Sequence, residues 1–265
     1  MKLTWLTDIH LNFLSRQMVE AFIRSVADTE SDAILITGDI GEAKDTVRYL
    51  EALAHAVDRP VYFVLGNHDF YRGSIDDVRA SVEALSDRHL DLTWIPHSGI
   101  IKLTQSCCLI GHDGWGDARL GNWSGSRIAL SDWSLISEFM RIGGKGRIGL
   151  LRKLGEEAAM HLEAVLPTAL SKFQSIIVAT HVPPFREACW HRGKTSDDDW
   201  LPFFACKAVG DVLNAAMLQH PDKTMLVLCG HTHSPGEASI LPNLTVYTGA
   251  AEYQKPIIQR VLLVK

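Results

Sequence analysis

The sequence predicts an α/β protein, and two patterns carry that prediction. Between residues 1 and 90, short apolar runs rich in β-branched residues alternate three times with segments of helical period. This alternation is typical of right-handed βαβ crossovers and a largely parallel sheet. Further strand-like runs in the middle and at the end of the chain predict a second sheet.

The first sheet is expected to form from residues 1–90. Its three strands are expected at 3–7, 33–37 and 61–65, where apolar and β-branched residues predominate. Its three helices are expected at 16–29, 42–57 and 75–89, where apolar residues recur at helical spacing. The polar loops that follow these strands must therefore open on one edge of the sheet.

The rest of the chain is less regular. Strand-like runs are expected at 92–95, 100–104, 107–111, 175–180, 225–229, 244–248 and 257–264, and helices at 150–173 and 206–219. Residues 115–147 show no clean period and contain Trp115, Trp123 and Trp133. We interpret this segment as an insertion over the site that shapes a substrate pocket and not a metal site. Ordinary core tryptophans are the alternative. The polar stretch 186–200 is expected to be a mobile surface loop.

Composition excludes several classes of protein. The chain has 265 residues, of which 46% are hydrophobic and 22% charged, as in a soluble globular protein with a sizeable core. The net charge of −5 and the scattered Lys and Arg argue against an extended nucleic-acid or acidic-membrane surface. No apolar run approaches transmembrane length and no signal-peptide pattern is present, so we expect a cytoplasmic protein. The five cysteines form no CxxC and are expected to be free thiols. Oligomeric state is left open.

Polar side chains stand directly after five of the predicted strands. The clearest group is Gly66-Asn67-His68-Asp69, after the strand at 61–65. Asn67 offers a carbonyl oxygen and His68 an imidazole, while the carboxylate of Asp69 is close enough to orient one of them. A glycine here lets the backbone turn where a Cβ would obstruct it. An Asn-Gly-type turn with a surface histidine is the structural alternative for these four residues.

Four other strand ends carry side chains of the same kinds. They contribute Asp8, His10, Asp39, His181, His231 and His233. Asp8 and His10, and likewise His231 and His233, are two residues apart and can point to the same side of an extended segment, where a pair could bind one ion. Any one of these motifs has a structural explanation, but five of them at strand ends indicate a shared site.

With Asn67, these are seven oxygen or imidazole donors and no thiolate. Seven donors exceed what one tetrahedral zinc takes from protein, and they suit two ions that share a bridging carboxylate. A donor set without sulfur suits Mn, Fe, Zn or Ni better than Ca. Two cations roughly 3.5–4 Å apart can clamp the attacking and leaving oxygens of a phosphoester. They also lower the pKa of a bridging water, so that hydroxide is present at neutral pH.

Five motifs in this order resemble the calcineurin-like metallophosphoesterase family. They are Asp8-x-His10, Gly38-Asp39, Gly66-Asn67-His68-Asp69, Thr180-His181 and Gly230-His231-Thr232-His233. The resemblance implies a four-layer α/β/β/α sandwich of two mixed sheets flanked by helices. It also implies that residues 1–265 form a single domain with a cap insertion around 115–147.

The resemblance further implies a role for each site residue. A first metal ion would be held by Asp8, His10, Asp39 and His233. A second would be held by Asp39, Asn67, His181 and His231, with Asp39 bridging. His68 would be the catalytic histidine, and it suits the general acid, since a non-ligand imidazole can be cationic near pH 7. Asp69 would either orient His68 or support the ligands from behind without binding an ion.

The function expected on these grounds is hydrolysis of small phosphomonoesters or phosphodiesters, nucleotide-type substrates included. A nuclease on the same scaffold is one alternative, although no basic stripe accompanies the motifs. A non-catalytic interaction module is another, but such a protein should have lost His68 or a ligand. An enzyme acting on pyrophosphate or lipid-linked phosphate is the third.

Overall fold

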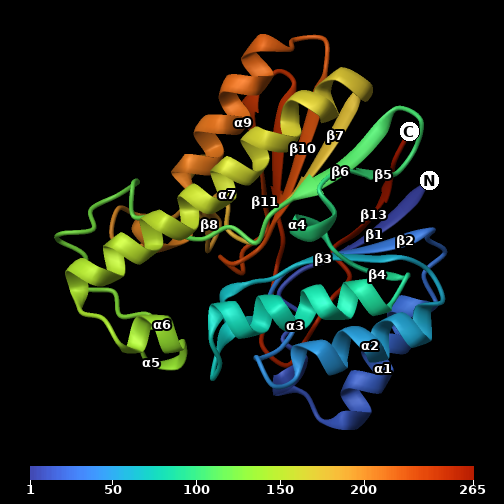
Figure 1. Cartoon of the computed structure of the whole chain (residues 1–265), viewed down its shortest axis with the longest axis horizontal. Coiled ribbons are helices and arrows are strands. Elements are labelled where there is room, and N and C mark those ends of the chain that lie inside the picture. Colours follow the sequence, from blue (N-terminus) through green and yellow to red (C-terminus); the bar gives the residue numbers. More distant parts are fainter.

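The computed structural model describes residues 1–265 and contains two mixed sheets that pack face to face (Figure 1). The first has the order β13-β1-β2-β3-β4, with bounds Arg260–Leu263, Lys2–Leu6, Ala33–Thr37, Val61–Val64 and Leu92–Trp94. Strands β1 to β4 are parallel, and β13 pairs antiparallel with β1. The predicted βαβ crossovers therefore build this sheet.

The second sheet has the order β11-β12-β10-β7-β6-β5. Its strands are Gly236–Leu241, Leu244–Thr248, Thr224–Cys229, Ser175–Ala179, Cys107–Gly111 and Ile101–Lys102. The four inner strands are parallel, and β11 and β5 are antiparallel at the two edges. A separate hairpin joins β8 (Trp190–His191) and β9 (Lys194–Thr195), so the expected surface loop at 186–200 contains regular structure.

Helices cover both outer faces (Figure 1). The first sheet carries α1 (Arg16–Ala27), α2 (Thr46–Val57) and α3 (Ile75–Arg88), and the second carries α7 (Gly144–Lys172) and α9 (Lys207–Gln219). The short helices are α4 (Ile95–Ser98), α5 (Asp132–Leu135), α6 (Ser137–Met140) and α8 (Leu201–Phe204), and the 3₁₀ turns are η1 (Leu11–Phe13), η2 (Asn67–Phe70) and η3 (Arg186–Ala188). The four-layer sandwich is confirmed.

Apolar side chains fill three layers of core. Between the sheets, Trp5, Leu35, Leu109 and Leu228 belong to one buried cluster. Of two larger clusters, one lies between the first sheet and its helices and the other between the second sheet and its helices. The continuous apolar runs of the central strands are explained by this burial on both faces.

The structure differs from the sequence prediction in places where periodicity gave no signal. Helix α7 begins at Gly144 and not at 150, and β11 was not predicted because its edge position leaves Glu237 and Ser239 exposed. The 3₁₀ turns at strand ends are too short to show a period. These elements are set by tertiary contacts and not by local pattern.

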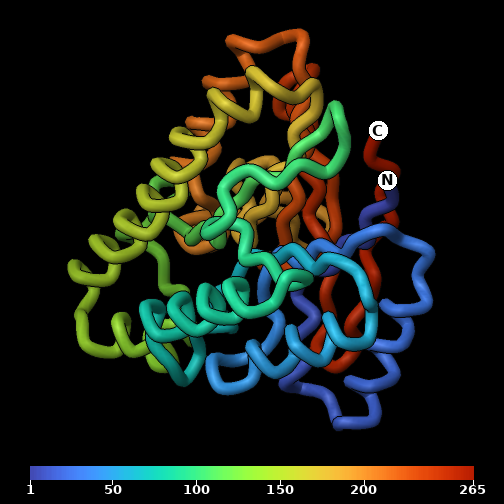
Figure 2. Tube along the Cα trace, turned by 45° about the vertical axis from the view of Figure 1, so that its right-hand side comes forward, coloured from blue at the N-terminus to red at the C-terminus, as the bar shows by residue number.

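Residues 115–147 lie beside the N-terminal end of α7, with α5 and α6 away from both sheets (Figures 1 and 2). Trp115 is a core residue, and Trp123 and Trp133 are partly buried and pack against the core. Trp115 is 4% exposed and packs on Phe70 and Phe139, with ring centroids 5.5 and 5.8 Å away. Trp133 packs on Phe139 at 5.0 Å. The alternative interpretation, that the tryptophans serve packing, is the one that the structure supports.

The two termini lie side by side (Figure 2), where the N-terminal ammonium donates to the carbonyl oxygen of Val264 at 3.0 Å. All five cysteines are free and buried. Among the helices, not one combines the length and the apolar character that crossing a bilayer requires.

Candidate metal centre

The seven predicted ligands come together where strands of the two sheets end. Loops after β1, β2 and β3 bring Asp8, His10, Asp39 and Asn67 from the first sheet. Loops after β7 and β10 bring His181, His231 and His233 from the second. Five of the seven residues are buried, and His231 and His233 are partly exposed. The centre therefore lies at the seam between the sheets.

Five of these residues adopt left-handed backbone conformations. The φ angles are 48° at Asp8, 41° at His10, 55° at Asp39, 70° at His231 and 57° at His233. Non-glycine residues rarely occupy this region, and such strain concentrates at functional sites. The expectation that Asp8 and His10 share one side of an extended segment is wrong, because β1 ends at Leu6 and a left-handed turn aims them instead.

Two motif glycines allow the loops to approach closely. An added Cβ at Gly66 would lie 2.2 Å from Oδ1 of Asp39, and one at Gly230 would lie 1.9 Å from Oδ2 of Asp8. Both distances are far below van der Waals contact. Glycine is therefore required so that one loop can pack directly on the carboxylate of another.

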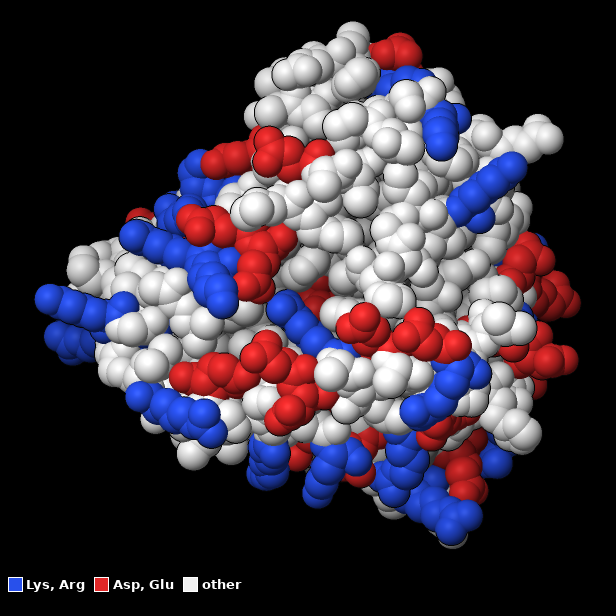
Figure 3. Space-filling view, viewed as in Figure 1, with Lys and Arg blue, Asp and Glu red and all other residues white.

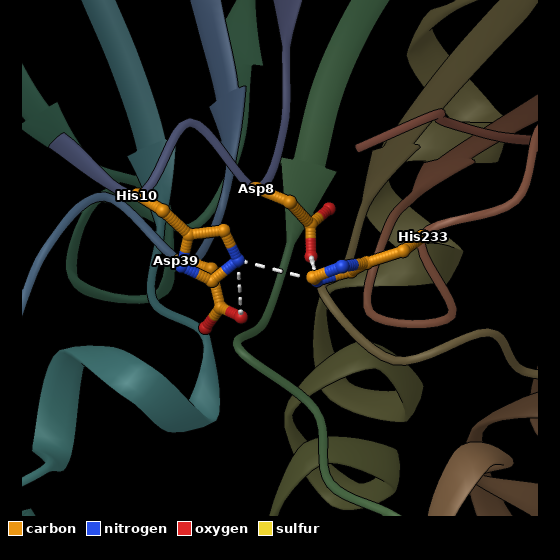
Figure 4. A group of neighbouring side chains, drawn as sticks. All are labelled: Asp8, His10, Asp39 and His233. Atoms are coloured by element: carbon orange, nitrogen blue, oxygen red, sulfur yellow. Dashed lines mark hydrogen bonds and ion pairs between the residues drawn. The ribbon is translucent and has the colours of Figure 1, made fainter. Parts of the chain in front are cut away.

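The first group consists of Asp8, His10, Asp39 and His233 (Figure 4). Their potential ligand atoms all lie within 4.8 Å of one another. Nε2 of His10 is 3.2 Å from Nε2 of His233 and 3.6 Å from Oδ2 of Asp39. Nε2 of His233 is 3.3 Å from Oδ1 of Asp8. These are the four residues that the family resemblance in the sequence assigned to the first metal ion.

The second group consists of Asp39, Asn67, His181 and His231. Oδ1 of Asp39 is 3.4 Å from Nε2 of His181, which is 3.2 Å from Nδ1 of His231. Nδ1 of His231 is 3.1 Å from Oδ1 of Asn67. The two carboxylate oxygens of Asp39 thus face different groups, as a bridging ligand requires. His231 and His233 serve different groups and do not form a pair on one ion.

Hydrogen bonds on the far side of two rings show that this second group suits a cation. Nδ1 of His181 lies 2.9 Å from the carbonyl oxygen of Thr37 and must be its donor. Nε2 of His231 lies 3.1 Å from the carbonyl oxygen of Phe203 and donates likewise. When each imidazole is neutral, its other nitrogen carries a lone pair. The lone pairs of both rings then face the oxygens of Asn67 and Asp39. None of these facing atoms carries a hydrogen that it could donate to another.

The spacing and charge of both groups also fit cations. Ligand atoms about 2.0–2.2 Å from one ion lie about 3.0–3.5 Å from each other, which matches most of the separations above. No Lys or Arg nitrogen lies within 4.0 Å of the carboxylates of Asp8 or Asp39. Burial, followed by the nearby carboxylates of Asp8 and Asp69, raises the pKa of Asp39 well above its usual range. Buried carboxylates of this kind need a counter-charge.

Sequence reasoning missed two residues that orient Asn67. Nδ2 of Asn67 donates to Oδ1 of Asp132 at 2.9 Å and lies 3.1 Å from the hydroxyl of Tyr71. The Tyr71 hydroxyl in turn donates to the same Asp132 oxygen at 2.7 Å. No local signal marks Asp132, because it lies in the aperiodic segment 115–147. Segment 115–147 thus supplies no member of either group but touches one of them, Asn67, through Asp132.

His68 lies at the edge of the first group and not within it. Its Nε2 is 4.0 Å from Oδ2 of Asp39, and its ring stacks on Tyr71 with centroids 4.2 Å apart. Burial, with the nearby histidines His181 and His233, lowers the pKa of His68 to about 3. This environment disfavours the cationic imidazole that the sequence predicts.

Asp69 does not contact the imidazole of His68. Its Oδ1 accepts hydrogen bonds from the backbone N–H of Ile40 and Gly41 and from the hydroxyl of Thr46, at 2.9–3.0 Å. Its Oδ2 accepts from the backbone N–H of Gly66 at 2.9 Å. The side chain therefore ties the Asp39 loop to the Asn67 loop, and the expectation that it orients His68 is replaced by this role.

A cavity of about 380 Å³ opens over the centre. It is lined by Asp39, Asn67, His68, Tyr71, Ala129, Leu130, Ser131, Asp132, His191, Trp200, Phe204, His231, Thr232, His233 and Tyr253. No Lys or Arg is among these residues. In this lining Trp200 stacks on Phe204 at 4.9 Å, and Tyr253 lies 5.2 Å from the ring of His233.

Comparisons with known structures agree with this fold. Phosphopantetheinyl hydrolase (PptH) from Mycobacterium tuberculosis is 13% identical with a TM-score of 0.68, over 96% of this chain and 90% of its own. A dimetal phosphatase from Danio rerio is 14% identical with a TM-score of 0.59, over 97% of this chain and 89% of its own. A search of curated protein sequences finds no match.

A family model gives the identity of the chain at the level of the family. The model of the calcineurin-like phosphoesterases matches residues 1–235. This match includes the loops after β1, β2, β3, β7 and β10 that carry the two groups of ligands. The chain therefore belongs to the calcineurin-like phosphoesterase family.

Proposed function

We propose that this protein hydrolyses small phosphoesters with two metal ions, drawn from Mn, Fe, Zn and Ni. The first ion would be held by Asp8, His10, Asp39 and His233, and the second by Asp39, Asn67, His181 and His231. The observation that carries the proposal is the convergence of two sets of lone-pair donors that share the carboxylate of Asp39. Together such ions supply charge neutralisation for the phosphate and an acidified water as nucleophile.

The protein's own residues keep the centre in shape. The backbone N–H of His68 donates to Oδ1 of Asp39 at 2.9 Å, which fixes the plane of the bridging carboxylate. The backbone N–H of His231 donates to the carboxylate of Asp8 at 3.0 Å, and the hydroxyl of Thr7 donates to it at 2.6 Å. These bonds hold the ligands near their working positions before any ion binds.

We assign to His68 the protonation of the leaving oxygen. Its imidazole lines the cavity beside the first group but is not one of the four ligands there. Stacking on Tyr71 and an edge contact with His10 at 4.6 Å hold the ring in place. A phosphate that binds over the ions would bring the negative charge that favours the protonated ring.

The cavity supports a substrate with one phosphate and an uncharged, ring-bearing or apolar organic part. With no Lys or Arg in its lining, it offers no counter-charge for further phosphates. The Trp200–Phe204 stack and Tyr253 offer flat surfaces for such a substrate. On the face in Figure 3, acidic and basic side chains are interspersed without a continuous basic stripe, which does not favour nucleic acid. We further propose residues 1–265 as a single domain, with 115–147 as its cap.

A substrate panel on Mn²⁺-loaded protein tests this function. The panel pairs phenyl with methyl phosphomonoesters and phosphodiesters. Because the structures with the same fold include a phosphopantetheinyl hydrolase, it also contains a pantetheine phosphoester, together with cyclic nucleotides, nucleotide sugars and an oligonucleotide. We expect metal-dependent turnover of ring-bearing single-phosphate esters above the others. Absence of turnover throughout, with both ions bound, would contradict the proposal.

A further inference from the structure

Segment 115–147 contains a side chain that contacts the metal centre. Asp132, at the start of α5, is 2% exposed and shares a single oxygen, Oδ1, between Nδ2 of Asn67 and the hydroxyl of Tyr71. Sixty-five positions separate Asp132 from Asn67 in the sequence. We infer that Asp132 is a positioning residue, through which the cap sets the affinity of the second metal ion. This inference rests on the proposed function.

Hydrogen bonding orients the side-chain amide of Asn67. An amide presents an acceptor oxygen on one side and a donor nitrogen on the other. A carboxylate can only accept, so Asp132 draws the nitrogen towards itself at 2.9 Å. The oxygen is thereby turned to the opposite side, where it lies 3.1 Å from Nδ1 of His231 in the second group. Without Asp132, the amide would be free to rotate its nitrogen towards the ion.

Tyr71 takes part in the same hydrogen bonding. Its hydroxyl donates to Asp132 at 2.7 Å and accepts from Asn67 at 3.1 Å, which closes a triangle of three buried side chains. The ring of Tyr71 also stacks on His68, with the two planes inclined by 29°. One hydrogen-bonded triangle thus orients a ligand of the second ion and supports the ring that we assign as general acid.

Hydrogen bonds also hold the segment that carries Asp132. Backbone bonds join the segment to the turn after η2, since the N–H of Arg72 donates to the carbonyl oxygen of Leu135 at 2.7 Å and the N–H of Ser137 donates to that of Gly73 at 3.0 Å. The carboxylate of Glu138 accepts from the N–H of Ile75 at 2.8 Å. These bonds attach the cap to the loop that carries Asn67. A displacement of the cap would therefore displace Asn67 as well.

The test compares variants of Asp132 by Mn²⁺ titration of metal-free protein, with free Mn²⁺ followed by electron paramagnetic resonance. Asp132→Ala should weaken one of the two ions by about 10–100-fold and leave the other within about threefold, matching Asn67→Ala. Asp132→Asn should stay near wild type, because one amide oxygen can accept both bonds. Ser134→Ala, on the same helix and exposed, is the control for folding and should bind as wild type.

The outcomes separate the two proposals. Wild-type binding of both ions by Asp132→Ala, or an equal loss of both, would overturn the role of Asp132 while the metal centre stands. Wild-type protein that binds no ion would overturn the proposed function itself. If Asp132→Ala does not fold, as judged by circular dichroism, Asp132→Leu replaces it. That variant keeps the shape of the side chain and removes the acceptor of both bonds, so it should weaken the same ion, and unchanged binding would refute the inference.

Discussion

Asp69 offers a sharp test of how the loops of the metal centre are held together. The side chain is fully buried and accepts four hydrogen bonds, three from backbone N–H groups and one from the hydroxyl of Thr46. Asp69→Ala would leave the three N–H groups without a partner in a buried site, whereas the Thr46 hydroxyl keeps the carbonyl oxygen of Glu42 as an acceptor at 3.1 Å. Each buried donor left unsatisfied costs about 1–3 kcal/mol.

These costs do not add fully, because the loops can relax and water can enter the space left by the carboxylate. We therefore expect Asp69→Ala to lower the free energy of unfolding of the metal-free protein by about 4 kcal/mol, in the lower half of the range for three unsatisfied N–H groups. Thr46→Val removes one of the four donors and should cost about 1–2 kcal/mol. The exposed Asp222, whose side chain makes no hydrogen bond, provides the matched control Asp222→Ala.

Urea unfolding of the metal-free variants, followed by circular dichroism, measures these differences. The midpoint for Asp69→Ala should fall by about 1 M or more, with Thr46→Val intermediate and Asp222→Ala close to wild type. A loss below about 1 kcal/mol in Asp69→Ala would refute the loop-tying role. So would a loss equal to that of Asp222→Ala.

Three further predictions follow from the site. Asn67→Ala should spare the first ion and weaken the second, measured as two separate Mn²⁺ affinities; loss of both to the same degree would refute the assignment. His68→Ala should retain both ions and lower kcat/KM by about 10²–10⁴ for an alkyl phosphoester but much less for a nitrophenyl one, since nitrophenolate leaves without a proton; equal losses would point to phosphate positioning instead. Trp200→Ala should raise KM several-fold for a phenyl ester and leave the methyl ester unchanged; an equal change for both would contradict the aromatic wall.

The sequence was sufficient for the longer strands and helices, apart from β11, and for naming the seven candidate ligands, because both depend on local patterns. Uninterrupted apolar runs mark strands buried on two faces, and glycines after them mark close loop contacts such as that of Gly66 with Asp39. The triangle around Asn67 could not be predicted. Asp132 stands 65 positions away in a segment without a period, and only the packed tertiary structure brings the two together.

The environment of individual side chains was also beyond prediction. The local spacing of His68 and Asp69 suggested a pair, but the turn of η2 sends Asp69 inward to four donors and His68 outward to the cavity. Likewise, burial lowers the pKa of His68 to about 3. This shift depends on the surrounding fold and cannot be predicted from composition. Directions of side chains depend on backbone turns, and five residues of this site adopt the uncommon left-handed form.

The central claim is that the carboxylate of Asp39 serves two ions at once. Elemental analysis of Mn²⁺-loaded protein, dialysed against a low fixed concentration of free Mn²⁺, tests it in wild type and in Asp39→Asn. The variant keeps the shape of the side chain but removes the shared charge, so both ions should weaken together. We expect two ions per chain in wild type and fewer than one in Asp39→Asn. One ion in wild type, or two fully retained in the variant, would contradict the dinuclear centre.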